Sequence, residues 1–238
     1  MITLYGSFAS FGLPQASPFV MKSEVQLKMA GVRYRLERGA PQDGPKGKVP
    51  FIVDGDMRLG DSTFIRAYIE AEHGIDLDRG LTAEMRGRAW AIERMLEDHL
   101  YWAILNLRWM DEENFAKGPA HFFDALPEGQ RDQARAARRQ QVGEMLRAHG
   151  LGRHSPAEIE ALGRRSIAAL AALLGNKRHL MGPEPTAVDA TAFAMMASLL
   201  TPFFTSGLRD DAAGFANLVA YCERMMGEYY PAFARKAA

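Results

Sequence analysis

Residues 48–69 of this chain read KVPFIVDGDMRLGDSTFIRAYI, and they predict a β-hairpin followed by an amphipathic helix. Residues 51–53 are aromatic and β-branched, as in a short strand, and the pair Asp54-Gly55 is a signal for a tight turn. Residues 57–59 then return as a second strand. Beyond residue 61, apolar side chains recur at helical spacing. They are Phe64, Ile65, Tyr68 and Ile69.

Two features of this stretch bear on ligand binding. Pro50 cannot donate to a strand ladder, so it marks an edge or a turn, and a cis bond at this position would turn the N–H and C=O of Val49 toward a ligand. Asp61 and Ser62 stand at a helix start, where free N–H groups and the helix dipole favour a bound carboxylate. The plain alternative is a hairpin followed by a capped helix.

The residues before the hairpin predict a β-α-β unit. Residues 2–5 are strand-like, Pro18 fits the first position of a helix with Ser17 as its N-cap, and residues 32–36 form a second strand. With the hairpin and its helix, the order becomes β-α-β-loop-β-β-α and closes near residue 74. This order predicts a small mixed sheet with helices.

The sequence of Val-Pro, strand, turn, strand, Asp-Ser and helix resembles the glutathione-binding half of the glutathione S-transferase superfamily, whose N-terminal domain is thioredoxin-like. In that family a cis Val-Pro backbone pairs with the cysteinyl part of glutathione, and an acidic residue followed by Ser holds the γ-glutamyl end. The resemblance implies a glutathione-binding set of Lys48, Val49, Pro50, Asp61 and Ser62. Most cytosolic members have Glu or Gln where this chain has Asp61, so the chain departs from the pattern there.

Ser17-Pro18-Phe19 resembles the first-helix start of the serine- and cysteine-type transferases in this superfamily, which implies that Ser17 activates the glutathione thiol. A thiolate at a helix N-terminus is stabilised by N–H groups and the dipole, and a hydroxyl there can donate one hydrogen bond to it. The alternative is an ordinary N-cap serine. Three rivals for contact with the thiol precede it. Ser7 and Ser10 lie in the long loop 6–16, and Tyr5 ends a strand whose alternation favours a core position for its side chain.

Composition excludes several function classes. The 238 residues carry 29 basic and 29 acidic side chains, whereas a nucleic-acid binder usually has a basic excess. The single Cys222 excludes an internal disulfide framework and a multi-cysteine metal site, and it fits a reducing, cytoplasmic location. No secretory signal is apparent, and the apolar stretch 190–200 is shorter than the roughly 20 residues of a membrane span. The histidines, which show no close pairing and predict no metal, are His73, His99, His121, His149, His154 and His179.

After residue 74 the composition becomes helical. We therefore predict a thioredoxin-like domain over 1–74, a linker over 75–80 and an all-α domain over 81–238, the architecture of the glutathione S-transferase fold. The helix predicted at 82–110 would be about 44 Å long, enough to bend or break. A loop is predicted at 111–129. Further helices are predicted at 130–149, 159–174, 186–200 and 217–230.

Two sets of helical side chains leave alternatives open. Aromatic residues at helical spacing usually pack in a core, although some could line an apolar substrate pocket. They are Trp90, Tyr101, Trp102 and Trp109. An arginine run usually forms a solvated face, with a docking surface for an acidic partner as the alternative. Its members are Arg131, Arg135, Arg138, Arg139 and Arg147.

Two later motifs also resemble the superfamily. Thr186-Ala187-Val188-Asp189 is a capping box before a very apolar helix, as in the family's C-terminal domain, and implies a structural role for Thr186 and Asp189. Arg108-Trp109, the segment 150–155 and the segment 217–221 resemble the branch of the failed axon connections and metaxin-like proteins.

The resemblance implies an enzyme in which Ser17 activates glutathione to conjugate or reduce a hydrophobic electrophile, acting as a homodimer without metal. A non-catalytic binding or scaffold module with a protein partner is the alternative. A disulfide reductase is disfavoured, because reduction would require a cysteine at position 17 and Cys222 lies in a late helix.

Overall fold

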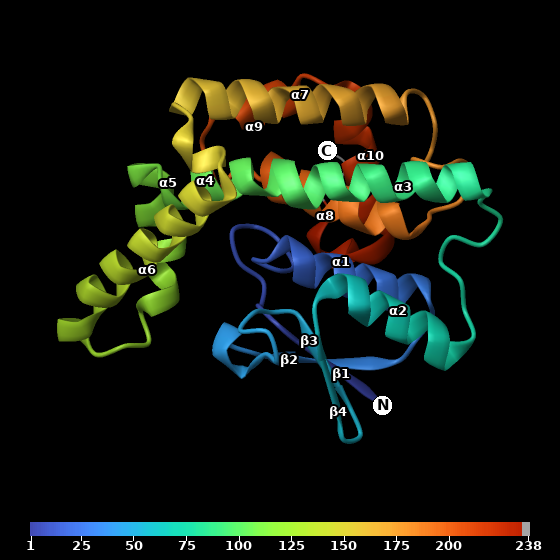
Figure 1. Ribbon diagram of the computed structural model, residues 1–238, viewed down its shortest axis with the longest axis horizontal. Helices are drawn as coiled ribbons and strands as arrows, with labels where there is room; N and C mark the ends of the chain where they lie inside the picture. Colours follow the sequence, from blue (N-terminus) through green and yellow to red (C-terminus); the bar gives the residue numbers. More distant parts are fainter. Residues whose placement is uncertain (235–238) are drawn as a thin grey trace.

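A computed structural model describes residues 1–234 of the chain (Figure 1). The first part forms a four-stranded sheet with two helices, in the strand order β2-β1-β3-β4. β1 pairs parallel with β2 and antiparallel with β3, and β3 pairs antiparallel with β4. The elements are β1 (Ile2–Gly6), α1 (Pro18–Met29), β2 (Tyr34–Arg38), β3 (Phe51–Asp54), β4 (Met57–Gly60) and α2 (Ser62–His73). The predicted mixed sheet is confirmed.

Strand alternation separates the two faces of this sheet. The inner face packs against α1 and α2 in a hydrophobic cluster of Ile2, Leu4, Leu27, Ile52, Ile65 and Ile69. On the other face the ring of Tyr5 stacks on the ring of Phe51, with centroids 4.6 Å apart. The two helices therefore cover only one face of the sheet, as Figure 1 shows.

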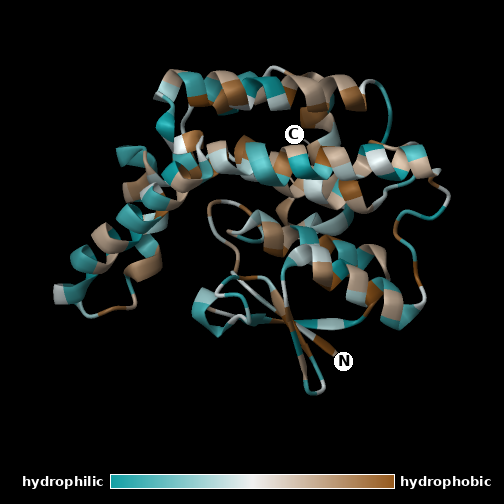
Figure 2. Cartoon of the chain, in the orientation of Figure 1, coloured by the Kyte–Doolittle hydropathy of each residue, from teal (hydrophilic) through white to brown (hydrophobic). Residues whose placement is uncertain are grey.

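The second part is helical, so the predicted combination of an α/β first part and an all-α second part is present. α3 and α4 form one nearly continuous helix, and α7 and α8 lie on either side of it (Figure 1). Nearly every residue of α8 is buried, whereas hydrophilic residues are frequent along the projecting α6 (Figure 2). The helices are α3 (Ala83–Met95), α4 (Tyr101–Trp109), α5 (Glu112–Lys117), α6 (Glu128–His149), α7 (Pro156–Leu174), α8 (Ala187–Leu200), α9 (Gly207–Ala213) and α10 (Ala216–Tyr229).

The structure differs from the sequence prediction in three places. The helix predicted at 82–110 contains a π-helical turn at Leu96–Leu100, which joins α3 to α4. The predicted loop 111–129 contains α5 and a 3₁₀ turn, and α9 has no counterpart in the prediction. The reason is tertiary for α5, because the side chain of its residue Asn114 exchanges hydrogen bonds with Thr205, 91 residues away.

The sheet part and the helical part meet chiefly along α1, which packs against α8. Met21 and Val25 of α1 belong to the hydrophobic core of the helices rather than to the cluster under the sheet. The boundary predicted at 75–80 stays a prediction, and residues 235–238 of the predicted helical domain lie outside the described residues. Within residues 1–234, no helix combines the length and the apolar character needed to cross a bilayer.

Candidate functional site

The hairpin brings the predicted glutathione-binding residues side by side. The Val49–Pro50 peptide bond is cis. The N–H of Asp61 donates to the carbonyl of Pro50 at 3.3 Å, one step beyond the pair of Phe51 with Gly60. Val49 precedes both ladders of β3, so its N–H and C=O take no part in them. The start of α2 and the Val49-Pro50 backbone therefore lie together at the end of the β3–β4 ladder where β3 begins.

Asp61 is the N-cap of α2, as predicted from its place at a helix start. Its φ is +87°, in the region that few residues other than glycine adopt, and its Oδ1 accepts from the N–H of Thr63 at 3.0 Å. Its Oδ2 lies 3.8 Å from the Nζ of Lys46, which also sits 4.2 Å from the centre of the Phe64 ring. Ser62 follows as the first residue of the helix and is buried.

Of the two lysines in the loop that precedes β3, the structure places Lys46 beside Asp61, whereas the resemblance implies Lys48 for the glutathione site. Lys48 is exposed, and Lys46 is half-exposed above the helix start. The sequence prediction missed Lys46 because it lies in a turn-rich loop, where no periodicity indicates the direction of a side chain. The cation at this place suits a ligand carboxylate as well as it suits Asp61.

Ser17 stands at the N-cap of α1, but its hydroxyl makes no capping hydrogen bond. Its N–H donates to the Oγ of Ser7 at 3.1 Å, and the hydroxyl of Ser7 in turn lies 3.5 Å from the Oε1 of Gln15. β1 and β3 pair Tyr5 with Phe51, and the same register continued places Ser7 opposite Val49. The hydroxyl of Ser7 is thus engaged within the loop, while that of Ser17 is not used to hold its own helix.

The other rivals to Ser17 lie elsewhere. Tyr5 stacks on Phe51 on the face of the sheet that α1 does not cover. Ser10 exchanges backbone hydrogen bonds with Leu13 in a tight turn of the loop. Which of these side chains faces a thiol stays a prediction, and so do the binding roles of residues 48–50 and 61–62.

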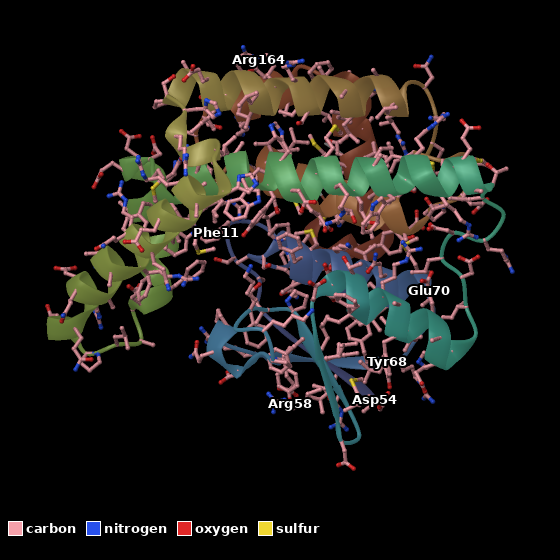
Figure 3. The ribbon with its side chains drawn as sticks, viewed as in Figure 1. Phe11, Asp54, Arg58, Tyr68, Glu70 and Arg164 are labelled. Carbon is pink, nitrogen blue, oxygen red and sulfur yellow. The ribbon has the colours of Figure 1, made fainter. Side chains whose placement is uncertain are left out.

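The loop between β1 and α1 is fastened to the helical part at Phe11. This residue has a φ of +59°, and its carbonyl accepts from the Oγ1 of Thr201 at 2.6 Å. Its ring lies 4.9 Å from that of Phe204 and 5.6 Å from that of the exposed Phe122. Figure 3 shows Phe11 between the helices and the sheet. The strained backbone is held by contacts from the other end of the chain, as strain at ligand sites often is.

A buried carboxylate ties this loop to distant segments. Glu24 of α1 accepts hydrogen bonds from Gln15 at 3.0 Å, from Tyr34 at 2.8 Å and from Tyr230 at 2.9 Å. Burial, followed by the charge of Glu24, raises the pKa of both tyrosine hydroxyls. A chain of contacts therefore runs from Tyr230 through Glu24, Gln15 and Ser7 to the N–H of Ser17. No sequence pattern signals it, because Tyr230 lies 206 residues from Glu24.

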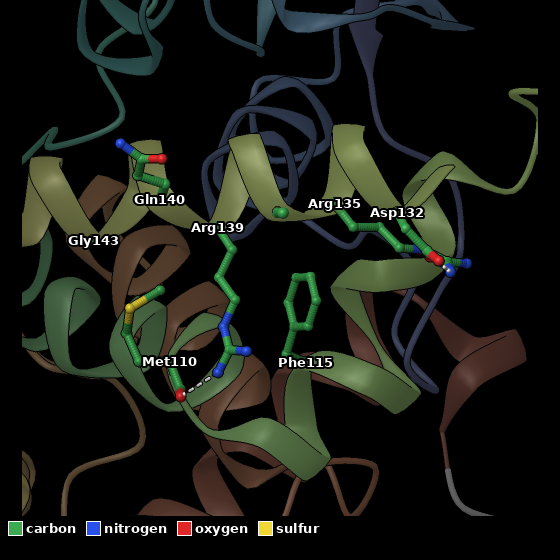
Figure 4. A pocket seen from close by; sticks show the side chains of 8 residues that line it. Met110, Phe115, Asp132, Arg135, Arg139, Gln140 and Gly143 are labelled. Carbon is green, nitrogen blue, oxygen red and sulfur yellow. Dashed lines mark hydrogen bonds and ion pairs between the residues drawn. The ribbon is translucent and has the colours of Figure 1, made fainter. Parts of the chain in front are cut away.

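A cavity of about 560 Å³ lies away from Ser17, between α6 and the end of α4 (Figure 4). Arg139 reaches across it and donates to the carbonyls of Trp109 at 3.0 Å and Met110 at 2.8 Å. Arg135 likewise donates to the carbonyl of Ala120 at 3.1 Å. Arg135 and Arg139 therefore bind backbone carbonyls of neighbouring segments, whereas the arginine run as a whole was expected to form a solvated face or a docking surface. Because both have protein partners, we assign the cavity no ligand.

No group of three or more His, Cys, Asp or Glu side chains within residues 1–234 is placed to hold a metal ion. Cys222 is buried, and burial raises the pKa of its thiol to about 12. The candidate site therefore consists of Ser17, the Val49-Pro50 backbone and the start of α2. Helix-start amides, a free hydroxyl and a neighbouring lysine are suited to a ligand with a carboxylate and a group that ionises.

Comparison with known proteins agrees with this geometry. Family models match for the glutathione S-transferase N-terminal domain over residues 18–114 and for the glutathione S-transferase C-terminal domain over residues 163–225. The isoprene-epoxide glutathione S-transferase of Rhodococcus sp. strain AD45 is 30% identical over 96% of this chain and 99% of its own. Failed axon connections of Drosophila melanogaster is 30% identical over 92% of this chain and 56% of its own.

More distant likenesses extend this result. Mouse metaxin-2 is 24% identical over 90% of this chain and 82% of its own. Among solved structures, a glutathione transferase family member from Pseudomonas fluorescens with two glutathione molecules bound has a TM-score of 0.65 at 16% identity, over 98% of this chain and 92% of that chain. The similarity to the Rhodococcus enzyme extends over nearly the whole chain, and the two domain models indicate the same family. The chain belongs to the glutathione S-transferase family.

Proposed function

We propose that this chain is a glutathione transferase that joins glutathione to a hydrophobic electrophile. The observation that carries the proposal is the hydrogen bond from Asp61 to Pro50, which sets the start of α2 beside the Val49 backbone. The amides of α2 and the hydroxyl of Ser62 would hold the γ-glutamyl carboxylate, and Val49 would pair with the cysteinyl unit. Lys48 was assigned to the same set, and Lys46 is the better placed of the two cations.

In this proposal Ser17 donates a hydrogen bond to the glutathione thiolate. Its hydroxyl is not used as a helix cap, and it stands at the positive end of α1. The name of the Rhodococcus relative makes an epoxide the first electrophile to test. The thiolate would attack an epoxide carbon, so that a C–S bond forms and a ring C–O bond breaks. The released oxygen then takes a proton from water.

The same fold supports a second candidate, a non-catalytic binding module acting through a protein partner. Failed axon connections and metaxin-2 bear names that state no reaction, and each covers at least nine-tenths of this chain. In addition, Asp61 stands where most cytosolic members of the family have Glu or Gln. For either candidate we propose a cytoplasmic homodimer, on the strength of the resemblance and of the single buried Cys222.

Calorimetric titration with glutathione separates the two candidates. We expect wild-type protein to bind, and Ser62→Ala to weaken the affinity by about tenfold, the effect of losing one hydrogen bond to a charged group. Ser17→Ala should bind within about threefold of wild type but lose conjugation of an epoxide. Ser155→Ala is the matched control, because Ser155 is also a serine at a helix start but caps the remote α7.

Wild-type protein that gives no heat at millimolar glutathione would exclude the transferase and favour the binding module. Equal weakening by Ser62→Ala and Ser155→Ala would instead remove Ser62 from the site. Binding that Ser62→Ala weakens, without turnover of any electrophile, would retain the glutathione site and favour the non-catalytic binding module.

A further inference from the structure

The most unusual buried side chain near Ser17 is Arg108 of α4, which is 6% exposed. Its Nη1 donates to the carbonyl of Ala16 at 3.1 Å, and its Nη2 donates to the carbonyl of Ser198 at 2.6 Å. Its Nε is buried and has no hydrogen-bond partner. Arg108 thus reaches from the helical part to the residue just before Ser17.

This contact completes the fixing of one peptide unit. The carbonyl of Ala16 and the N–H of Ser17 belong to the same planar peptide group and point in opposite directions within its plane. Arg108 holds the carbonyl, and Ser7 accepts from the N–H at 3.1 Å. With both polar atoms held, the Ala16–Ser17 peptide cannot rotate without breaking a buried hydrogen bond. The peptide plane that leads into Ser17 is therefore held from both sides.

The charge on Arg108 has no carboxylate partner within the described part of the chain. Its neighbours are two backbone carbonyls and the rings of Phe204 and Phe11, whose centres lie 4.8 Å and 5.7 Å from the guanidinium carbon. Burial lowers the pKa of Arg108 to about 10, which still leaves it charged at neutral pH. A buried charge without a counter-charge is costly.

The titratable groups around Arg108 do not supply the missing negative charge. Tyr101 stands about two turns earlier on the same helix, and its ring lies 4.7 Å from that of Phe19 in α1. Burial raises the pKa of the Tyr101 hydroxyl, although Arg108 and Arg138 act in the opposite direction. Tyr101 therefore stays neutral, and the positive potential beside Ala16 persists.

We propose that Arg108 is a positioning residue for Ser17, and that its uncompensated charge favours the thiolate form of glutathione at that hydroxyl. The inference rests on the proposed function, because it requires glutathione at the site. The bound thiolate would supply the negative counter-charge that Arg108 lacks within the described residues. Arg108 would not touch the thiol. It would act by holding the Ala16–Ser17 peptide and through the electrostatic field of its positive charge.

The test is the pKa of the glutathione thiol in the bound state, followed by the ultraviolet absorbance of the thiolate as pH is varied. We expect Arg108→Met to raise this pKa by about one unit, as removal of a nearby opposite charge does. Arg108→Lys keeps the charge and one donor, and it should recover most of the shift. Arg224→Met is the matched control, because Arg224 also donates to a carbonyl and lies near an aromatic ring, in α10.

Packing alone would give a different pattern. If Arg108→Met and Arg108→Lys raise the thiol pKa equally, or if neither raises it in folded protein, the inference fails while the proposed function stands. If wild-type protein binds no glutathione, both fail together. Should Arg108→Met not fold, Arg108→Gln retains a donor for Ala16 without the charge, and it must raise the thiol pKa for the inference to hold.

Discussion

Two buried cations join the start of α1 to the helical part, and their surroundings are opposite. The Nζ of Lys22, fully buried, lies 2.6 Å from a carboxylate oxygen of Glu93 and 2.6 Å from one of Glu97. Arg108 donates to the carbonyls of Ala16 and Ser198 and forms no ion pair within the described residues. Both cations connect segments far apart in the chain, but only Lys22 is neutralised where it lies.

The difference indicates different roles. Lys22 and its partners form a closed ionic cluster, in which Glu93 also accepts from the hydroxyl of Thr191 at 2.9 Å. Such a cluster specifies how two parts of a protein fit together and has no spare charge for a ligand. Arg108 leaves a positive potential beside Ser17. We therefore expect loss of Lys22 to affect stability most, and loss of Arg108 to affect chemistry most.

The largest effect is expected from Lys22→Met. The change leaves Glu93 and Glu97 buried without their shared cation, and breaking a buried pair typically costs about 3–5 kcal/mol. Urea unfolding followed by circular dichroism would measure the free energy of unfolding. Arg108→Met is the comparison variant, and it should cost less, about 1–3 kcal/mol, because it removes hydrogen bonds to two carbonyls together with an unpaired charge.

Equal losses in the two variants would break the contrast between the cations. A double variant, Lys22→Met with Glu93→Gln, should recover part of the lost stability, since Glu93 is the carboxylate left without an ion-pair partner, whereas Glu97 keeps Arg94. Lack of any recovery would mean that packing around Lys22, rather than charge, accounts for its effect.

The pH dependence sharpens the same contrast. Burial by itself raises the pKa of Glu93, but the charge and hydrogen bond of Lys22 and the hydroxyl of Thr191 lower it by more, so the net pKa lies below its ordinary value. A carboxyl with a depressed pKa in the folded state stabilises fully above its unfolded pKa of about 4.3 and loses that contribution as pH falls through the folded pKa.

The gap in unfolding free energy between wild type and Lys22→Met should therefore shrink as pH falls from neutral toward about 3, because protonation removes the charges that Lys22 neutralises. The gap between wild type and Arg108→Met should stay constant over the same range, since no carboxylate pairs with Arg108. Urea titrations at several pH values would measure both gaps. Parallel behaviour of the two gaps would contradict the assignment of partners.

The smallest effect is expected away from both cations, at the predicted capping box of α8. The hydroxyl and the N–H of Thr186 both donate to Oδ2 of Asp189, at 3.0 Å and 2.9 Å. Thr186→Ala removes one of these bonds and should cost about 1 kcal/mol, as the loss of a cap typically does. Chemical unfolding that shows no change would contradict this structural role.

Thr186→Ala also calibrates the comparison, because its cost should not vary between neutral and mildly acidic pH and it should leave the thiol pKa unchanged. The remaining oxygen of Asp189 accepts from the N–H of Leu180 at 2.9 Å and from the hydroxyl of Tyr221 at 3.0 Å. These contacts keep the carboxylate in place in the variant.

Much of the fold could be predicted from the sequence because its signals are local. The tight turn after Asp54, the apolar spacing from residue 64 and the proline at the start of α1 each act within a few residues. The turn of the hairpin also brings Pro50 next to Asp61, so this part of the candidate site could be predicted from local signals. α5 and α9 were not, because short helices depend on distant partners such as Thr205.

The sequence by itself determined the mixed sheet, the helical second part and the hairpin that sets Pro50 beside Asp61, since each follows from propensity and turn chemistry within a short segment. Only the tertiary structure decided that Lys46 rather than Lys48 meets Asp61, and that Glu24 collects Gln15, Tyr34 and Tyr230. It also placed Arg108 against the carbonyl of Ala16, 92 residues away. Such contacts depend on how α1, α4 and α8 pack together, and no local pattern in the chain encodes the distance between them.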